Sequence, residues 1–64
     1  MQGYTLAYTE RDDLGLPRGR HVMELDGGLT YPQMIAAARL NARMTGEPTT
    51  IIDDEGEETL TLWP

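Results

Sequence analysis

Residues 29–46 read LTYPQMIAAARLNARMTG, and they contain the start, the body and the end of one helix. Thr30 and Gln33 have the spacing of a capping box, in which each side chain accepts a hydrogen bond from the backbone N–H of the other residue. Gly46 can adopt the left-handed conformation that commonly ends a helix. These signals agree, so we predict one helix over residues 30–45, with the other segments packed around it.

The predicted helix has a broad apolar face and a second, smaller apolar edge. At about 100° per residue, one arc carries the side chains expected to face a core. They are Tyr31, Met34, Ile35, Ala38 and Ala42. Leu40 and Met44 form another i, i+4 pair away from this arc. In the simpler interpretation the sheet or a long loop covers this pair, because single surface Leu and Met residues are ordinary. The alternative is a patch for self-association or for a partner.

Four other segments have the alternation or the β-branched composition of strands. They are residues 4–9, 20–25, 49–53 and 59–63. The last two enclose a short polar loop around Gly56 and predict a hairpin. Residues 10–19, ERDDLGLPRG, instead mix acids, Gly and Pro in a way that favours a long connection over a tight hairpin.

The order strand, strand, helix, strand, strand predicts an α+β fold. One helix packs on a small, mostly antiparallel sheet, since this is the smallest two-layer arrangement that buries both apolar faces. We expect a single domain over residues 1–64 and see no internal repeat. The residues expected in the core are Leu6, Ile35, Ala38, Ile51, Leu60 and Leu62.

The composition is acidic, with eleven acidic residues against five arginines and a net charge of −6 over 64 residues. An anionic surface repels phosphate groups, so we expect no direct binding to nucleic acid or to membranes, and a basic protein as partner. The absence of cysteine excludes disulfides and thiolate metal sites. No apolar run suits a membrane span or a signal peptide, and we expect a cytoplasmic protein.

The reactive side chains argue against an enzyme. There is no Ser or Cys nucleophile and no Lys to form an imine. His21 is the sole imidazole, and as a strand residue it is more often an ordinary half-buried side chain than a base. The acids of residues 53–58 do not fit the spacing of a calcium-binding loop, and no phosphate-binding glycine motif occurs. We therefore predict no catalytic residue, no metal and no cofactor.

The acids gather in two clusters. One comprises Glu10, Asp12 and Asp13, and the other comprises Asp53, Asp54, Glu55, Glu57 and Glu58. Exposed turns accept such residues, and a charged hairpin protects a sheet edge against aggregation. The alternative is that the acids imitate a phosphate backbone, because carboxylates alternating along a strand lie about 6.6 Å apart on one face. In that interpretation both clusters bind a basic channel that evolved for nucleic acid.

In layout the chain resembles the small acidic inhibitors of phages and mobile elements, among them the anti-CRISPR proteins. The resemblance covers LAYT at residues 6–9, MIAAARLNARMTG at 34–46 and TTIIDDEGEETLTLW at 49–63. It implies a DNA mimic in the bacterial host cell that binds a basic surface of a defence protein, such as a CRISPR effector subunit, and blocks target DNA binding. The alternative is a small regulatory module that docks through Leu40 and Met44. Neither interpretation specifies an oligomeric state.

Overall fold

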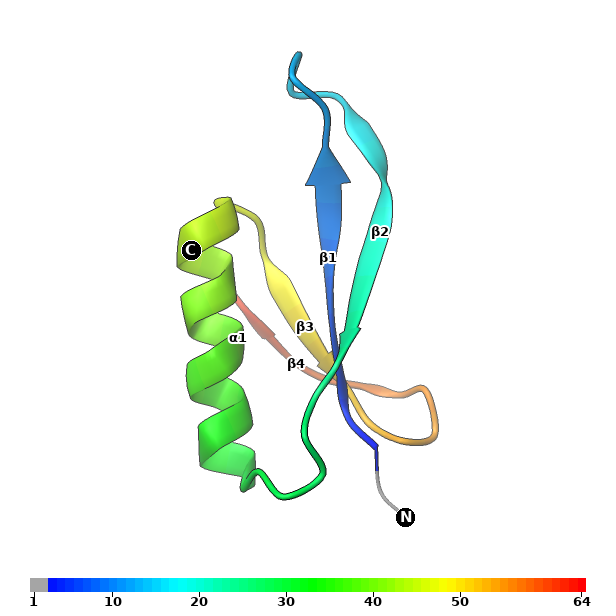
Figure 1. Ribbon diagram of the computed structural model, residues 1–64, viewed down its shortest axis with the longest axis vertical. Coiled ribbons are helices and arrows are strands. Elements are labelled where there is room, and N and C mark those ends of the chain that lie inside the picture. Colours follow the sequence, from blue (N-terminus) through cyan, green and yellow to red (C-terminus); the bar gives the residue numbers. More distant parts are fainter. Residues whose placement is uncertain (1–2) are drawn as a thin grey trace.

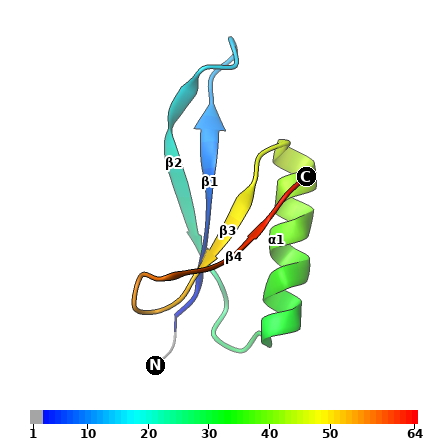
Figure 2. The ribbon, with the colours of Figure 1, turned by 180° about the vertical axis from the view of Figure 1, so that it is seen from behind.

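The computed structural model describes residues 3–64, in which one helix covers one face of a four-stranded antiparallel sheet (Figures 1 and 2). The elements are β1 (Thr5–Arg11), β2 (Pro17–Glu24), α1 (Tyr31–Thr45), β3 (Thr49–Ile52) and β4 (Glu58–Leu62). In the sheet the strands have the order β2-β1-β3-β4, so β2 and β4 are its two edges. The α+β fold predicted from the order of the elements is confirmed.

The ends of α1 are those that the sequence predicts. The Thr30 hydroxyl accepts a hydrogen bond from the Gln33 N–H at 3.3 Å, and the Gln33 side chain accepts one from the Thr30 N–H at 2.8 Å. Gly46 has φ 74° and donates its N–H to the Ala42 carbonyl at 2.8 Å. Both caps are confirmed. Within the described residues, no helix has the length and apolar character needed to cross a membrane.

The sheet consists of two hairpins joined by a short central pairing. β1 pairs with β3 only over Thr5, Leu6 and Ala7, and beyond this point the hairpin of β1 and β2 diverges from that of β3 and β4 (Figure 1). α1 packs mainly over β3 and β4. One face of the sheet is therefore covered by the helix over half of its width, and the other face is uncovered.

The core lies between α1 and the centre of the sheet. Its buried residues are Leu6, Met34, Ala38, Ile51 and Leu62. Leu6 and Ile51 stand opposite one another in β1 and β3, and Ile51 has no exposed surface. Of the predicted core residues, Leu6, Ala38, Ile51 and Leu62 are confirmed.

Two predicted core residues lie at its margin. Leu60 shares the face of Ile51, but it belongs to an edge strand and stays 38% exposed, so its assignment to the core is wrong. Ile35 is half-buried and packs against the core from one side. Met34 and Ala38 point more directly at the sheet because they lie on the helix stripe that α1 presents to it. Tyr31 is 39% exposed at the first turn of the helix.

The predicted long connection over residues 10–19 is wrong. β1 continues to Arg11, β2 begins at Pro17, and a five-residue loop joins them as a hairpin. Gly15 has φ 81°, a conformation that favours glycine and allows the chain to reverse tightly. The acids, Gly and Pro of this segment therefore belong to a tight turn and to strand ends.

Ile51 and Ile35 provide a test of this core. We expect Ile51→Ala to lower the free energy of unfolding by about 2–5 kcal/mol, because it leaves a cavity at a fully buried position. Ile35→Ala should cost clearly less, since its side chain already contacts solvent. Chemical denaturation followed by circular dichroism measures both losses. If Ile51→Ala does not fold, Ile51→Val replaces it, with an expected loss of unfolding free energy of about 0.5–1.5 kcal/mol. Equal losses at the two positions would contradict the packing described.

Candidate binding surfaces

The two hairpin loops have the same structure. They are residues 12–16, DDLGL, and residues 53–57, DDEGE. In both, Oδ1 of the first Asp accepts hydrogen bonds from the N–H groups of the third and fifth residues at 2.8–2.9 Å. The glycine has a positive φ, 81° in one loop and 86° in the other. This arrangement is typical of a type I turn followed by a glycine bulge.

The likeness extends into the strands. In each hairpin the register shifts by one residue directly after the loop, which leaves Arg18 of β2 and Thr59 of β4 without a partner in the register. The sequence signal for this shared turn is the pattern D-D-x-G-x, which occurs at residues 12–16 and again at 53–57.

Asp12 and Asp53 therefore have a structural role. Each carboxylate holds two backbone N–H groups of its own loop, which the chain would otherwise leave to solvent in a tight turn. Both residues are among the acids predicted from the sequence to bind a partner. In the structure their Oδ1 atoms are occupied, so the acids next to them are better suited to contact another molecule.

Two further predicted acids lie close to basic side chains. Glu58 of β4 accepts a hydrogen bond at 3.2 Å from Arg20 of β2. These strands are the two edges of the sheet, so the sheet is curved enough for the side chains to meet across its uncovered face. Glu10 lies 3.7 Å from Nδ1 of His21. Among residues 3–64, no ion pair involves Asp13, Asp54, Glu55 or Glu57.

The structure does not bring the two acidic clusters together. β1 and β3 are antiparallel neighbours, so the loops that follow them point in opposite directions. Figures 1 and 2 show the loop of residues 12–16 at one end of the molecule and the loop of residues 53–57 toward the other. The single acidic surface predicted from the sequence is thus divided into two.

The register places one further acid on the same face and at the same end of the sheet as Glu58, but on the opposite edge strand. Glu24 of β2 and Glu58 of β4 lie in one row across the sheet. Between them in this row are Thr5 of β1 and Ile52 of β3. Directly opposite residues in antiparallel strands share a face, and this face is the one that α1 leaves uncovered. We call the carboxylates at this end of the sheet the acidic end. Its members are Glu24, Asp54, Glu55, Glu57 and Glu58. No sequence signal identified Glu24, because its position depends on strand pairing.

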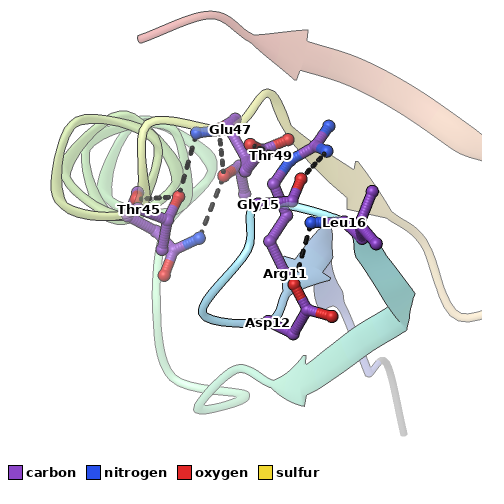
Figure 3. Close-up of polar contacts among 8 residues, drawn as sticks. Arg11, Asp12, Gly15, Leu16, Thr45, Glu47 and Thr49 are labelled. Carbon is purple, nitrogen blue, oxygen red and sulfur yellow. Dashed lines mark hydrogen bonds and ion pairs between the residues drawn. The ribbon is translucent and has the colours of Figure 1, made fainter.

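Arg11 connects the other end of the sheet to the helix (Figure 3). Its Nε donates to Glu47 at 2.6 Å and its Nη1 donates to the Gly15 carbonyl at 2.9 Å. The hydrogen bond and the charge of Glu47 raise the pKa of Arg11, so the guanidinium remains charged. Close by, the Asn41 amide donates to the Thr49 hydroxyl at 2.9 Å. These contacts fix the end of α1 to β1 and β3.

The second predicted surface is exposed. Leu40 is 59% and Met44 is 76% exposed on α1. The simpler interpretation, in which the sheet or a loop covers this pair, is therefore wrong. The loop of residues 12–16 also presents apolar side chains to solvent, with Leu14 and Leu16 both exposed. Exposed apolar side chains are therefore present at this loop as well as at the predicted pair on α1.

Small-molecule chemistry has little support in the geometry. In the part of the chain that the structure describes, two well-formed pockets have volumes of about 210 and 270 Å³, both below the roughly 300 Å³ at which ligand sites usually begin. The larger is lined by side chains that include Glu10, Arg11 and Glu47, two of which already form an ion pair. Among the described residues, no group of three or more His, Asp or Glu is arranged to hold a metal ion. The prediction of a non-enzymatic protein stays a prediction.

The turn role of Asp53 is testable against its neighbour. Asp53→Ala removes the acceptor of two backbone hydrogen bonds, and we expect it to lower the free energy of unfolding by about 1 kcal/mol. Asp54→Ala, one position along, should change it by less than about 0.5 kcal/mol. Asp12→Ala and Asp13→Ala form the matching pair in the other hairpin. Thermal or urea denaturation measures all four, and equal effects within either pair would contradict the turn role.

Comparisons with protein-family models, with curated proteins and with solved structures find no match to this chain. The function is therefore inferred from the charges, contacts and exposed surfaces that the chain itself presents.

Proposed function

We propose that this protein is a non-enzymatic inhibitor that binds the basic nucleic-acid site of a bacterial defence protein through its acidic end. The observation that carries the proposal is the concentration of exposed carboxylates there. Residues 53–58 contain five acids and no base. Within the described chain, only Glu58 of these five belongs to an ion pair.

The opposite end of the sheet is a weaker candidate. Its acids Glu10, Asp12 and Asp13 share the hairpin with Arg11 and Arg18, so its excess of negative charge is smaller than that of residues 53–58. The predicted cluster of Glu10, Asp12 and Asp13 is therefore left out of the proposed site. The acidic end keeps its excess charge and can steer the protein toward a cationic groove.

The positions of these carboxylates support DNA mimicry. Glu24 and Glu58 stand on one face of the sheet, and Asp54, Glu55 and Glu57 extend the charge along the adjoining hairpin. In a basic channel, these carboxylates would take the place of phosphate groups. The resemblance in layout to anti-CRISPR proteins supports a CRISPR effector subunit as the partner.

A matched pair of variants tests the proposal. The protein is immobilised and incubated with bacterial lysate, and the bound protein is identified by mass spectrometry. Asp54→Asn/Glu55→Gln should bind the captured protein roughly tenfold more weakly, about 1.4 kcal/mol, because it loses two charges of the acidic end. Glu10→Gln/Asp13→Asn loses the same two charges at the other hairpin and should bind like the unmodified protein. Both variants keep Asp12 and Asp53, so the turns are preserved.

The nature of the captured protein is the second readout. We expect a nucleic-acid-binding protein that double-stranded DNA displaces and that elutes as salt rises, because the Debye length falls to about 3 Å at 1 M. Capture that resists both DNA and salt would contradict mimicry. So would equal loss of binding in the two double variants.

The exposed pair Leu40 and Met44 supports a second candidate, a regulatory module that docks through α1. Apolar contacts are insensitive to screening, so binding of this kind should persist at high salt. Leu40→Glu/Met44→Glu would then abolish capture while Asp54→Asn/Glu55→Gln leaves it intact. Both Leu40 and Met44 are largely exposed, so their replacement should leave the fold unchanged.

A further inference from the structure

A small pocket lies where the start of α1 meets the start of β1. It is lined by Tyr4, Gly27, Leu29, Tyr31 and Met34 and has a volume of about 210 Å³. This is less than most sites for free small molecules provide, but a cavity of about 150 Å³ already holds one benzene molecule. The pocket therefore suits one planar group of that size, such as the end of a single side chain.

Two tyrosine rings line this pocket. The ring centroids of Tyr4 and Tyr31 lie 6.3 Å apart, and the ring planes meet at 62° in an edge-to-face arrangement. The face of an aromatic ring carries partial negative charge, and it attracts a cation that comes within about 6 Å of its centroid. A cationic group in the pocket can lie within this distance of both rings.

The ring of Tyr31 is held in position by β4. Its hydroxyl donates a hydrogen bond to Oγ1 of Thr59 at 3.2 Å, and the Thr59 hydroxyl donates to the Ile51 carbonyl at 3.1 Å. The side chain nevertheless stays 39% exposed. An exposed ring that is already fixed loses little conformational freedom when a ligand binds to it.

The charge around the pocket is negative. Residues 3–9 and 24–34 supply its lining, and they contain two acids, Glu24 and Asp26, and no base. Among residues 3–64, neither acid belongs to an ion pair. The acidic hairpin of residues 53–57 lies toward the same end of the molecule as the start of α1 (Figure 1). The electrostatic field at the pocket therefore favours a cation.

The start of α1 is poorly suited to an anion. Free backbone N–H groups usually make the first turn of a helix an anion site. Here the Gln33 N–H donates to the Thr30 hydroxyl, the Thr30 N–H donates to the Gln33 side chain, and Pro32 has no N–H. An anion at this helix end would find few free donors and would meet the carboxylates nearby.

We propose that this pocket binds an arginine side chain of the basic partner. Arginine suits it better than lysine, because the guanidinium group is planar, stacks on aromatic faces and is more weakly hydrated than an ammonium group. Arginine is also the residue that nucleic-acid sites use most readily to hold phosphates. The identity of the partner rests on the proposed function, whereas the preference for arginine is a property of this chain alone.

The larger pocket provides an internal comparison. It too is lined by a tyrosine and by acids, Tyr8 with Glu10 and Glu47. Arg11 of the same chain also lines it and donates to Glu47 at 2.6 Å. That pocket already has its guanidinium group, whereas the segments that line the pocket of Tyr4 and Tyr31 supply none.

A titration of the whole chain with N-acetyl-arginine amide, followed by NMR at low salt, tests the pocket. We expect the ring resonances of Tyr4 and Tyr31 to shift together and to saturate near millimolar concentrations, while those of Tyr8 stay in place. N-acetyl-citrulline amide has the same shape without the charge, and it should bind roughly tenfold more weakly.

A matched pair of variants assigns the binding to the rings. Tyr4→Leu keeps an apolar side chain but removes an aromatic face, and it should bind blocked arginine roughly tenfold more weakly. Tyr8→Leu makes the same change on the same strand, outside this pocket, and should bind as the unmodified protein does. If circular dichroism shows that Tyr4→Leu does not fold, Tyr31→Leu replaces it, since Tyr31 is already partly exposed.

Four results would overturn the assignment of this pocket to arginine. They are the absence of a saturable shift at Tyr4 and Tyr31, equal affinity for the arginine and citrulline compounds, equal affinity for blocked lysine, and equal loss of binding in the two leucine variants. Equal affinity for citrulline would identify an apolar slot, and equal loss would identify general attraction of cations to an acidic chain.

The two proposals fail in different ways. Asp54→Asn/Glu55→Gln keeps both rings, so it should still prefer blocked arginine to blocked citrulline while it loses the captured partner. Capture of a protein that does not bind nucleic acid would contradict the proposed function and leave the preference for arginine intact. Capture of the expected partner by a chain that shows no such preference would overturn the arginine pocket alone.

Discussion

The antiparallel pairing of Thr5, Leu6 and Ala7 with β3 is the constraint on which the rest of the structure depends. Within residues 3–64 it is the only sheet contact between the two hairpins, and it places Leu6 opposite Ile51 at the centre of the core. Because the pairing is antiparallel, the loop after β1 and the loop after β3 must point in opposite directions. The separation of the two acidic clusters is thus a consequence of the same few residues that form the core.

The helix could be predicted from the sequence because all its signals are local. Thr30, Gln33 and Gly46 act on backbone groups within four residues of themselves, and no tertiary contact is needed to interpret them. The burial of Leu60 could not be predicted in the same way. Alternation indicates on which face of the sheet a residue lies, but it does not indicate whether its strand is at an edge. The position of Glu24 beside the acidic end likewise depends on register, which the sequence does not display.

The repeated hairpin shows how one backbone structure presents two different surfaces. Residues 12–16 and 53–57 use the same hydrogen bonds from Asp and the same left-handed Gly. The positions that this turn leaves exposed are filled by Leu14 and Leu16 in one copy, and by Glu in both places in the other. Asp and Gly are fixed by backbone geometry, whereas the residues between and after them are free to vary. The chemical difference between the two ends of the molecule therefore leaves the hydrogen bonds of both turns unchanged.

The charge at the acidic end is less easily accommodated within the monomer. Residues 53–58 contain no base, and the one basic contact comes from Arg20 on the opposite edge, across the uncovered face of the sheet. Repulsion among neighbouring carboxylates opposes folding and is strongest when they are fixed in place. A hairpin that needs only Asp53 for its turn nevertheless carries four further acids. A cationic partner would relieve this repulsion on binding.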